Sequence, residues 1–196
     1  MSVAHQEAPK TSPGVYLALE RQSSDKHEYF DGVILNMPGG SPEHDLIAGN
    51  LYVLLYNHVG DGPCTAFTSN MKVRTERAGL FSYPDLTIVC GEPRYHDSHR
   101  DVLTNPKVVF EVLSPSTADF DRGGKRIKYQ SIKSLSDYLL VSQDVPRVEH
   151  WSRGSKGVWL VAAVEDIKGQ VHVKALDCTL RLTDIYRRIK FGAPNR

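Results

Sequence analysis

Two apolar runs, each interrupted by one acidic residue, constrain the fold of this chain more than any other feature. The first run is YPDLTIVC over residues 83–90, and the second is PKVVFEVL over residues 106–113. Both runs are rich in β-branched and aromatic residues and are bounded by Pro or Gly, so both predict buried β-strands. An ionised carboxylate in such a strand is costly unless a positive group compensates it. Asp85 and Glu111 therefore predict a shared positive partner, either a divalent metal ion or a lysine.

The bulk properties fit an ordinary folded domain. The chain has 196 residues, of which 40% are apolar and 24% charged, and this is enough for one hydrophobic core. We expect a flexible lead over residues 1–14 and a single domain over residues 15–196. No apolar run is long enough to cross a bilayer, so we expect no membrane partner. The three cysteines, odd in number and without a C-x-x-C motif, predict free thiols in a reducing compartment, and hence a cytoplasmic protein; they are Cys64, Cys90 and Cys178.

The net charge gives no support to nucleic-acid binding by the molecule as a whole. It is +1 at pH 7, whereas a protein that coats DNA is usually strongly basic. A nuclease is still compatible with this value, because acidic metal ligands offset basic phosphate contacts. Any basic surface must therefore be local.

The order of the predicted elements indicates an α/β fold, with a mixed β-sheet flanked by helices and a β-rich C-terminal tail. Asp31-Gly32 between apolar runs predicts a hairpin over residues 28–35. Ser41 as cap and Pro42 as first residue predict a long helix to Val59, and apolar side chains on two sides of it predict that most of its surface is covered. The remaining expectations are a short helix (16–21), a strand (65–77), a polar loop (91–105), a basic helix (121–133), a strand (137–142), a hairpin (147–164), a strand (171–176) and a last helix capped by Thr183.

The two acidic residues are placed where they can meet. Side chains alternate along a strand, so Lys107, Glu111 and Leu113 share one face. Asp85 begins its strand directly after Pro84, where a bend would expose the carboxylate. Two such carboxylates can bind one Mg²⁺, which accepts one or two carboxylates and keeps several waters. The ion can then polarise a phosphodiester and lower the pKa of a bound water.

These segments resemble the PD-(D/E)XK nuclease superfamily, and more closely its Uma2 family, also called DUF820. Pro84-Asp85 matches the first half of the signature and Glu111-Val112-Leu113 the second, and the wider pattern from residues 28–32 through 42–44 and 111–117 to Asp121, Lys125 and Tyr129 is similar to that of Uma2. The resemblance covers roughly residues 16–148. It implies a restriction-endonuclease-like core and a nuclease acting on DNA, with Mg²⁺ or Mn²⁺ bound by Asp85 and Glu111. A homodimer is left open, because cutting both strands of a duplex favours two-fold symmetry.

Leu113 departs from the signature, because it occupies the position that usually holds a lysine. Leucine carries no charge, so another cation must take that place. The predicted helix over residues 121–133 offers Lys125 and Lys128. The resemblance favours Lys125 and keeps Lys128 in reserve, with the role of orienting the attacking water or stabilising the developing phosphorane charge.

Two further site residues follow mainly from the family pattern. His44 lies at the end of the core-facing stripe of the long helix and is a candidate proton shuttle or outer metal partner. Glu28 is a candidate for a further acidic group. For both, a local structural role is the competing interpretation. The competing function is a non-catalytic nucleic-acid-binding or regulatory module that retains the nuclease fold, an alternative that Leu113 and the near-neutral charge favour.

Overall fold

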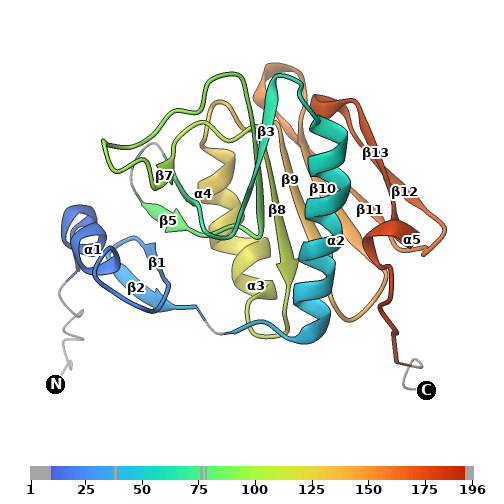
Figure 1. The fold of residues 1–196 in the computed structure, drawn as a ribbon, viewed down its shortest axis with the longest axis horizontal. Coiled ribbons are helices and arrows are strands. Elements are labelled where there is room, and N and C mark those ends of the chain that lie inside the picture. The colour runs from blue at the N-terminus through green and yellow to red at the C-terminus, as the bar shows by residue number, and fades with distance from the viewer. Residues whose placement is uncertain (1–9, 38, 76, 78, 193–196) are drawn as a thin grey trace, which may run out of the picture.

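The computed structural model of the protein describes residues 10–37, 39–75, 77 and 79–192. In this part of the chain, a six-stranded mixed sheet has helices on both faces (Figure 1). Its strand order is β11-β10-β9-β8-β6-β3, and only the pair β8 and β9 is parallel. The strands are β3 (Cys64–Thr68), β6 (Leu86–Cys90), β8 (Val108–Leu113), β9 (Asp137–Ser142), β10 (Val148–Arg153) and β11 (Trp159–Val164). The mixed α/β fold and both buried strands are confirmed, but only Glu111 lies within its strand, because Asp85 immediately precedes the first residue of β6.

A second, smaller sheet packs beside the first, with strand order β2-β1-β5-β4-β7. Its strands are β1 (His27–Phe30), β2 (Val33–Asn36), β4 (Lys72–Arg74), β5 (Leu80–Ser82) and β7 (Val102–Leu103), and α1 (Pro13–Glu20) covers its outer face. The predicted hairpin is confirmed: Asp31 and Gly32 turn the chain with φ of 47° and 99°. Positive φ at both central residues is the requirement of the type I′ turn that suits a two-residue hairpin.

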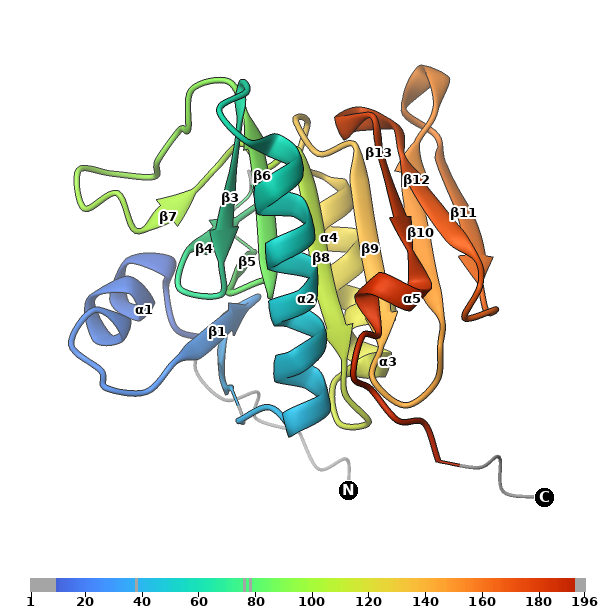
Figure 2. The same ribbon diagram turned by 45° about the vertical axis from the view of Figure 1, so that its right-hand side comes forward.

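Helix α2 (Pro42–Val59) crosses one face of the six-stranded sheet (Figure 1). The Ser41 side chain accepts a hydrogen bond from the His44 backbone N–H, so the predicted cap is confirmed. The expectation that most of this helix is covered is wrong. Val53 is 56% exposed and Tyr56 is 57% exposed, and only Ile47, Leu51 and Leu55 are buried. The described elements beside α2 flank it without crossing its outer surface (Figure 2).

The other face of the sheet is covered by a bent helical segment rather than by one basic helix. It consists of α3 (Ala118–Phe120), a π-helical turn (Asp121–Lys125) and α4 (Arg126–Gln130). The bend lies at Gly123, whose backbone leaves helical geometry at φ −100° and ψ −105°. The two adjacent glycines permit this conformation, which a straight amphipathic pattern did not predict.

Three other predicted boundaries are wrong. The single strand over residues 65–77 is two strands, β3 and β4, which belong to different sheets and are separated by a turn after Thr68. The loop over residues 91–105 contains β7. Thr183 does not cap the last helix, α5 (Leu182–Ile185), which begins one residue before it.

The β-rich C-terminal tail is confirmed, and it completes the core. Strands β12 (Gln170–Val173) and β13 (Cys178–Arg181) form a hairpin that lies beside α2 (Figure 2). Val171, Val173 and Leu180 join the same apolar cluster as the buried face of α2. The tail therefore contributes to the hydrophobic core on the α2 side of the sheet.

The prediction of three free thiols is wrong, because Cys64 and Cys90 form a disulfide. The two residues are direct register partners on β3 and β6, a proximity that their separation in sequence hides. Only Cys178 is a free cysteine among the described residues, and the cytoplasmic location stays a prediction. Within the same residues, every helix is too short or too polar to span a bilayer. Residues 1–9 of the predicted lead lie outside the described residues, and Pro13 and Gly14 already belong to α1.

Candidate functional site

A cavity of about 580 Å³ lies at the carboxyl end of β8. The start of α2 and the bent helical segment meet there (Figure 1). The lining brings together all five candidate site residues of the sequence: Glu28, His44, Asp85, Glu111 and Lys125. Segments that are far apart in sequence therefore converge on one concave surface.

Asp85 and Glu111 meet because β6 and β8 are antiparallel neighbours. Leu86 is the register partner of Phe110, so one residue further along, Asp85 lies opposite Glu111. The Asp85 Oδ2 accepts a hydrogen bond of 2.7 Å from the Val112 backbone N–H, which fixes the carboxylate at the end of the sheet. Both carboxylates line the same cavity.

Lys125 supplies the positive charge that Leu113 lacks. Its Nζ lies 3.0 Å from Glu111 Oε1, 2.9 Å from Glu28 Oε1 and 3.3 Å from Asp121 Oδ1, and all four side chains are buried. The π-helical turn directs the lysine inward, and Gly124 allows a close approach, because a Cβ there would lie 3.0 Å from Phe30 Cζ. The reserve candidate Lys128 points elsewhere and pairs with Asp31 at 2.6 Å.

The buried cluster holds more negative than positive charge. Glu28, Glu111 and Asp121 surround the single ammonium of Lys125. Burial raises the pKa of Glu111 well above its ordinary value, and the neighbouring acids add to the shift while Lys125 opposes it. Burial by itself lowers the pKa of Lys125, but the attraction of the three acids outweighs burial and raises that pKa well above its ordinary value. The lysine therefore stays protonated, and the acids can take up a further cation or a proton.

His44 contacts Asp85 from the other layer of the fold. Its Nε2 lies 3.4 Å from Asp85 Oδ2. The hydrogen bond to Asp85 is the main cause that raises the pKa of His44 above 6.5, and the Val112 carbonyl adds to it while burial opposes it. Since Ser41 caps α2 through the His44 N–H, the helix start positions the imidazole directly.

Two buried groups in this cluster were not singled out from the sequence as site residues. Asp121 pairs with Lys125 through its Oδ1. The Tyr129 hydroxyl donates to Glu111 Oε1 at 3.1 Å and lies 2.6 Å from Ser82 Oγ. Both residues are four positions from Lys125, so helical spacing was the available signal.

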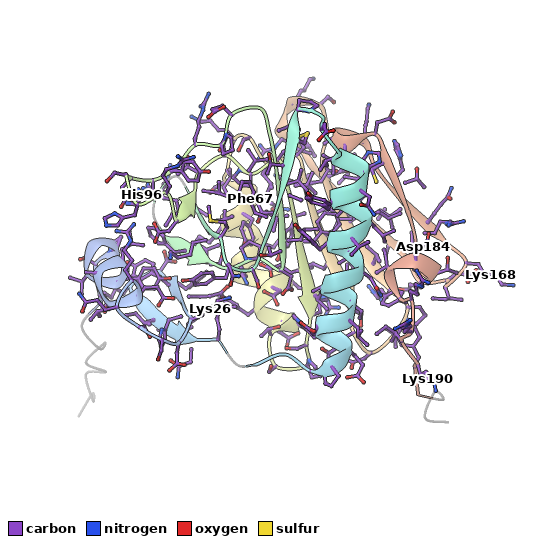
Figure 3. The ribbon with its side chains drawn as sticks, viewed as in Figure 1. Lys26, Phe67, His96, Lys168, Asp184 and Lys190 are labelled. Carbon is purple, nitrogen blue, oxygen red and sulfur yellow. A yellow bond between two sulfur atoms is a disulfide. The ribbon has the colours of Figure 1, made fainter. Side chains whose placement is uncertain are left out.

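The sequence His96-Asp97-Ser98-His99 contains residue types that bind metal ions, but it is not part of this site. Asp97 pairs with Arg21 at 2.8 Å, and the His96 ring contacts Arg74. His96 projects from the margin of the molecule, far from α2 (Figure 3). The segment ties a surface loop to α1.

The residues of the cavity fit a divalent ion held by few protein ligands. Across residues 10–37, 39–75, 77 and 79–192, no group of three or more His, Cys, Asp or Glu side chains forms a complete metal cage. Mg²⁺ commonly uses one or two carboxylates and retains several waters. The excess of buried carboxylates over cations matches that demand.

The comparisons with known proteins agree on one family. Residues 14–183 match the Uma2 family, described as "Putative restriction endonuclease". Uncharacterized protein slr1290 of Synechocystis sp. (strain PCC 6803) is 36% identical over 183 residues, 93% of this chain and 95% of that protein. Uncharacterized protein sll1609 of the same organism is 35% identical over 146 residues, 74% of this chain and 82% of that protein.

A solved structure has the same fold. It is the crystal structure of a "putative nuclease belonging to DUF820" from Anabaena variabilis, which aligns with a TM-score of 0.73 at 15% identity. The alignment covers 89% of this chain and 97% of that chain. With the match over residues 14–183, these findings show that the chain belongs to the Uma2 family of restriction-endonuclease-like proteins.

Proposed function

We propose that this protein is a metal-dependent nuclease that hydrolyses DNA phosphodiester bonds. The observation that carries the proposal is the position of Lys125, whose ammonium lies 3.0 Å from Glu111 in a cavity that Asp85 also lines. The two carboxylates and one cation are therefore brought together, even though Leu113 occupies the usual position of the lysine. The lysine has moved from the strand to the following helix, and its charge is retained.

Asp85 and Glu111 would hold Mg²⁺ or Mn²⁺ in the cavity that both residues line. When bound, the ion supplies charge stabilisation to a phosphodiester and acidifies a coordinated water. Asp85 is prepared for this role because the Val112 N–H fixes one carboxylate oxygen. Glu111 is prepared because Tyr129 and Lys125 both contact Oε1 and thereby orient the carboxylate.

Lys125 acts as a fixed positive charge. The surrounding acids raise the pKa of its ammonium against the effect of burial, so it cannot serve as a base near neutral pH. It orients the attacking water or stabilises the phosphorane charge as it develops. Glu28 and Asp121 are positioning residues, because each contacts the lysine.

His44 is suited to move a proton. Its raised pKa keeps a larger fraction of the imidazole protonated near neutral pH than an ordinary histidine has. A protonated imidazole beside Asp85 can donate to the leaving oxygen as a general acid. In this proposal, His44 on α2 donates the proton to the leaving oxygen, and the residues beside β8 organise the attack of the water.

Nucleic acid is expected to bind only after a divalent ion does. The cavity is lined by four acids, and its basic side chains are His44 and Lys125. Such a surface repels phosphate until a cation neutralises it. A non-catalytic binding module would instead bind DNA without metal.

Isothermal titration with Mg²⁺ and Mn²⁺, followed by a plasmid-nicking assay, tests the proposal. Asp85→Asn should weaken metal binding and reduce nicking by more than the roughly 10- to 100-fold that loss of an outer-shell partner costs. Asp31→Asn is the matched control, since Asp31 is exposed and its ion pair among the described residues is with Lys128, outside the cavity. DNA binding that ignores both metal and Asp85→Asn would contradict a nuclease and support the module.

A further inference from the structure

Strand β11 is an unprotected edge of the six-stranded sheet. Its sequence is WLVAAV, without a charge or a proline, and among the strands of the described residues it pairs only with β10 (Figure 2). Leu160 is 58% exposed and Val161 is 53% exposed. Natural edge strands usually carry charges, prolines or bulges that prevent pairing with another chain. The opposite edge, β3, exposes Thr65 and Thr68 instead.

The backbone of β11 offers a regular row of unpaired groups. Arg153 is the register partner of Trp159, and one step beyond, Gly154 N–H donates to the Val158 carbonyl at 2.7 Å. Antiparallel pairs alternate between bonded and non-bonded positions. The N–H and C=O groups of Trp159, Val161 and Ala163 therefore point to the open edge, where no described strand pairs with them.

We infer that β11 pairs with β11 of a second copy of this chain, antiparallel, about a two-fold axis perpendicular to the sheet. With such an axis, the same face of the sheet points the same way in both copies. Each residue must therefore lie opposite a residue whose side chain is on that same face. Centring the axis on Val161 satisfies this condition and uses all three outward-facing residues. Trp159 then bonds Ala163 of the second copy, and Val161 bonds its own counterpart.

Charges at the ends of the strand favour this occupant over an unrelated peptide. Lys156 precedes β11, and Glu165 and Asp166 follow it. In the antiparallel arrangement, the end of β11 that follows Lys156 lies beside the end of the second copy that precedes Glu165 and Asp166, so opposite charges approach at both ends. A parallel arrangement would instead bring like charges together. The strand is therefore complementary to itself in this one orientation.

The pairing also fixes where the two cavities lie. Strand β11 runs in the same direction as β8, because β8 and β9 are parallel while β10 is antiparallel to both β9 and β11. The two-fold axis reverses this direction in the second copy. The cavities then lie at opposite ends of the joined sheet, so each copy acts on its own phosphodiester. The pairing does not depend on the proposed nuclease activity.

Sedimentation analysis of the full chain tests the pairing. The wild-type protein should have twice the chain mass of 21.9 kDa. Val161→Lys places two ammonium groups across the axis and should raise the dissociation constant at least about tenfold. Val53→Lys is the matched control, since Val53 is 56% exposed on α2 and should leave the dimer intact.

Two further measurements separate loss of pairing from loss of folding. Val161→Pro removes only an outward N–H, so it should dissociate the dimer and leave the circular dichroism spectrum unchanged. Mixing Leu160→Cys with Ala162→Cys copies should give a crosslinked heterodimer, because these positions form a non-bonded pair. A wild-type monomer, a Val161→Lys dimer as tight as wild type, or dissociation by Val53→Lys alone would each overturn the pairing.

Discussion

At the scale of single residues, the site depends on one ammonium shared by three acids. Lys125 contacts Glu28, Glu111 and Asp121 while Leu113 fills the usual lysine position with an apolar side chain. Leu113 is buried among apolar neighbours, so this strand position contributes packing and no charge. The positive charge of Lys125 instead reaches Glu111 from the helical segment that covers the sheet.

Replacing this lysine should abolish cleavage. Lys125→Met should lower turnover by about 10²- to 10³-fold or more, while metal binding at Asp85 and Glu111 persists in titrations. The uncompensated acids should also lower the free energy of unfolding by about 3–5 kcal/mol. Lys128→Met is the control: its exposed pair with Asp31 is worth at most about 1 kcal/mol, and turnover should not change. Full turnover in Lys125→Met would refute the role.

His44 should make stability depend on pH in a defined direction. Its pKa is raised in the folded protein, mainly by Asp85, so its stabilising contribution is complete below the unfolded value of 6.5. That contribution is lost as the pH rises through the folded pKa. Urea unfolding of wild type and His44→Gln should therefore differ more at acid pH than at alkaline pH. An equal difference in the free energy of unfolding at acid and alkaline pH would show that the imidazole charge is not coupled to Asp85.

At the scale of elements, the sequence predicts those features that local chemistry determines. Ser41-Pro42 sets the start of α2 and Asp31-Gly32 sets the first hairpin, and both are found as expected. The sequence could not predict which strands lie side by side in the folded structure. Cys64 meets Cys90 only because β3 and β6 are neighbours.

The same distinction applies to the site. Alternation along β8 placed Glu111 correctly, whereas the inward position of Lys125 depends on a π-helical turn that helical periodicity does not describe. Asp121 belongs to the family pattern but was assigned no site role, because it begins a charged helix, where solvated carboxylates are common. Its burial follows from the bend at Gly123.

Two substitutions in α2 should change stability in opposite directions. Ser41→Ala removes the acceptor for the His44 N–H and should cost about 1 kcal/mol. Gly49→Ala adds a methyl group where no atom lies within 4 Å, and it should stabilise the helix by about 0.5–1 kcal/mol. Thermal denaturation of both variants checks these signs. Stabilisation by Ser41→Ala would mean that the cap does not support the helix start.

At the scale of the whole molecule, metal binding should be visible as global stability. A ligand that binds only the folded state at 100 times its dissociation constant adds about 2.7 kcal/mol. Mg²⁺ should therefore raise the melting temperature of the wild type, and Asp85→Asn should remove this increase. An equal increase in both proteins would place the ion elsewhere.

The metal affinity should also rise with pH. Burial raises the pKa of Glu111, so below that pKa the ion must displace a proton. Affinity should then increase by up to about tenfold per pH unit until Glu111 is ionised in the free protein. Titration calorimetry in buffers of different ionisation enthalpy would count the released protons, and release of none would contradict the assignment of Glu111.

The most direct measurement is anomalous X-ray scattering from a crystal soaked in Mn²⁺. We expect one strong peak between the side-chain oxygens of Asp85 and Glu111, with the Lys125 ammonium beside it and no peak in an Asp85→Asn crystal. A peak only at other residues, or none at a saturating concentration, would contradict a metal-dependent nuclease site.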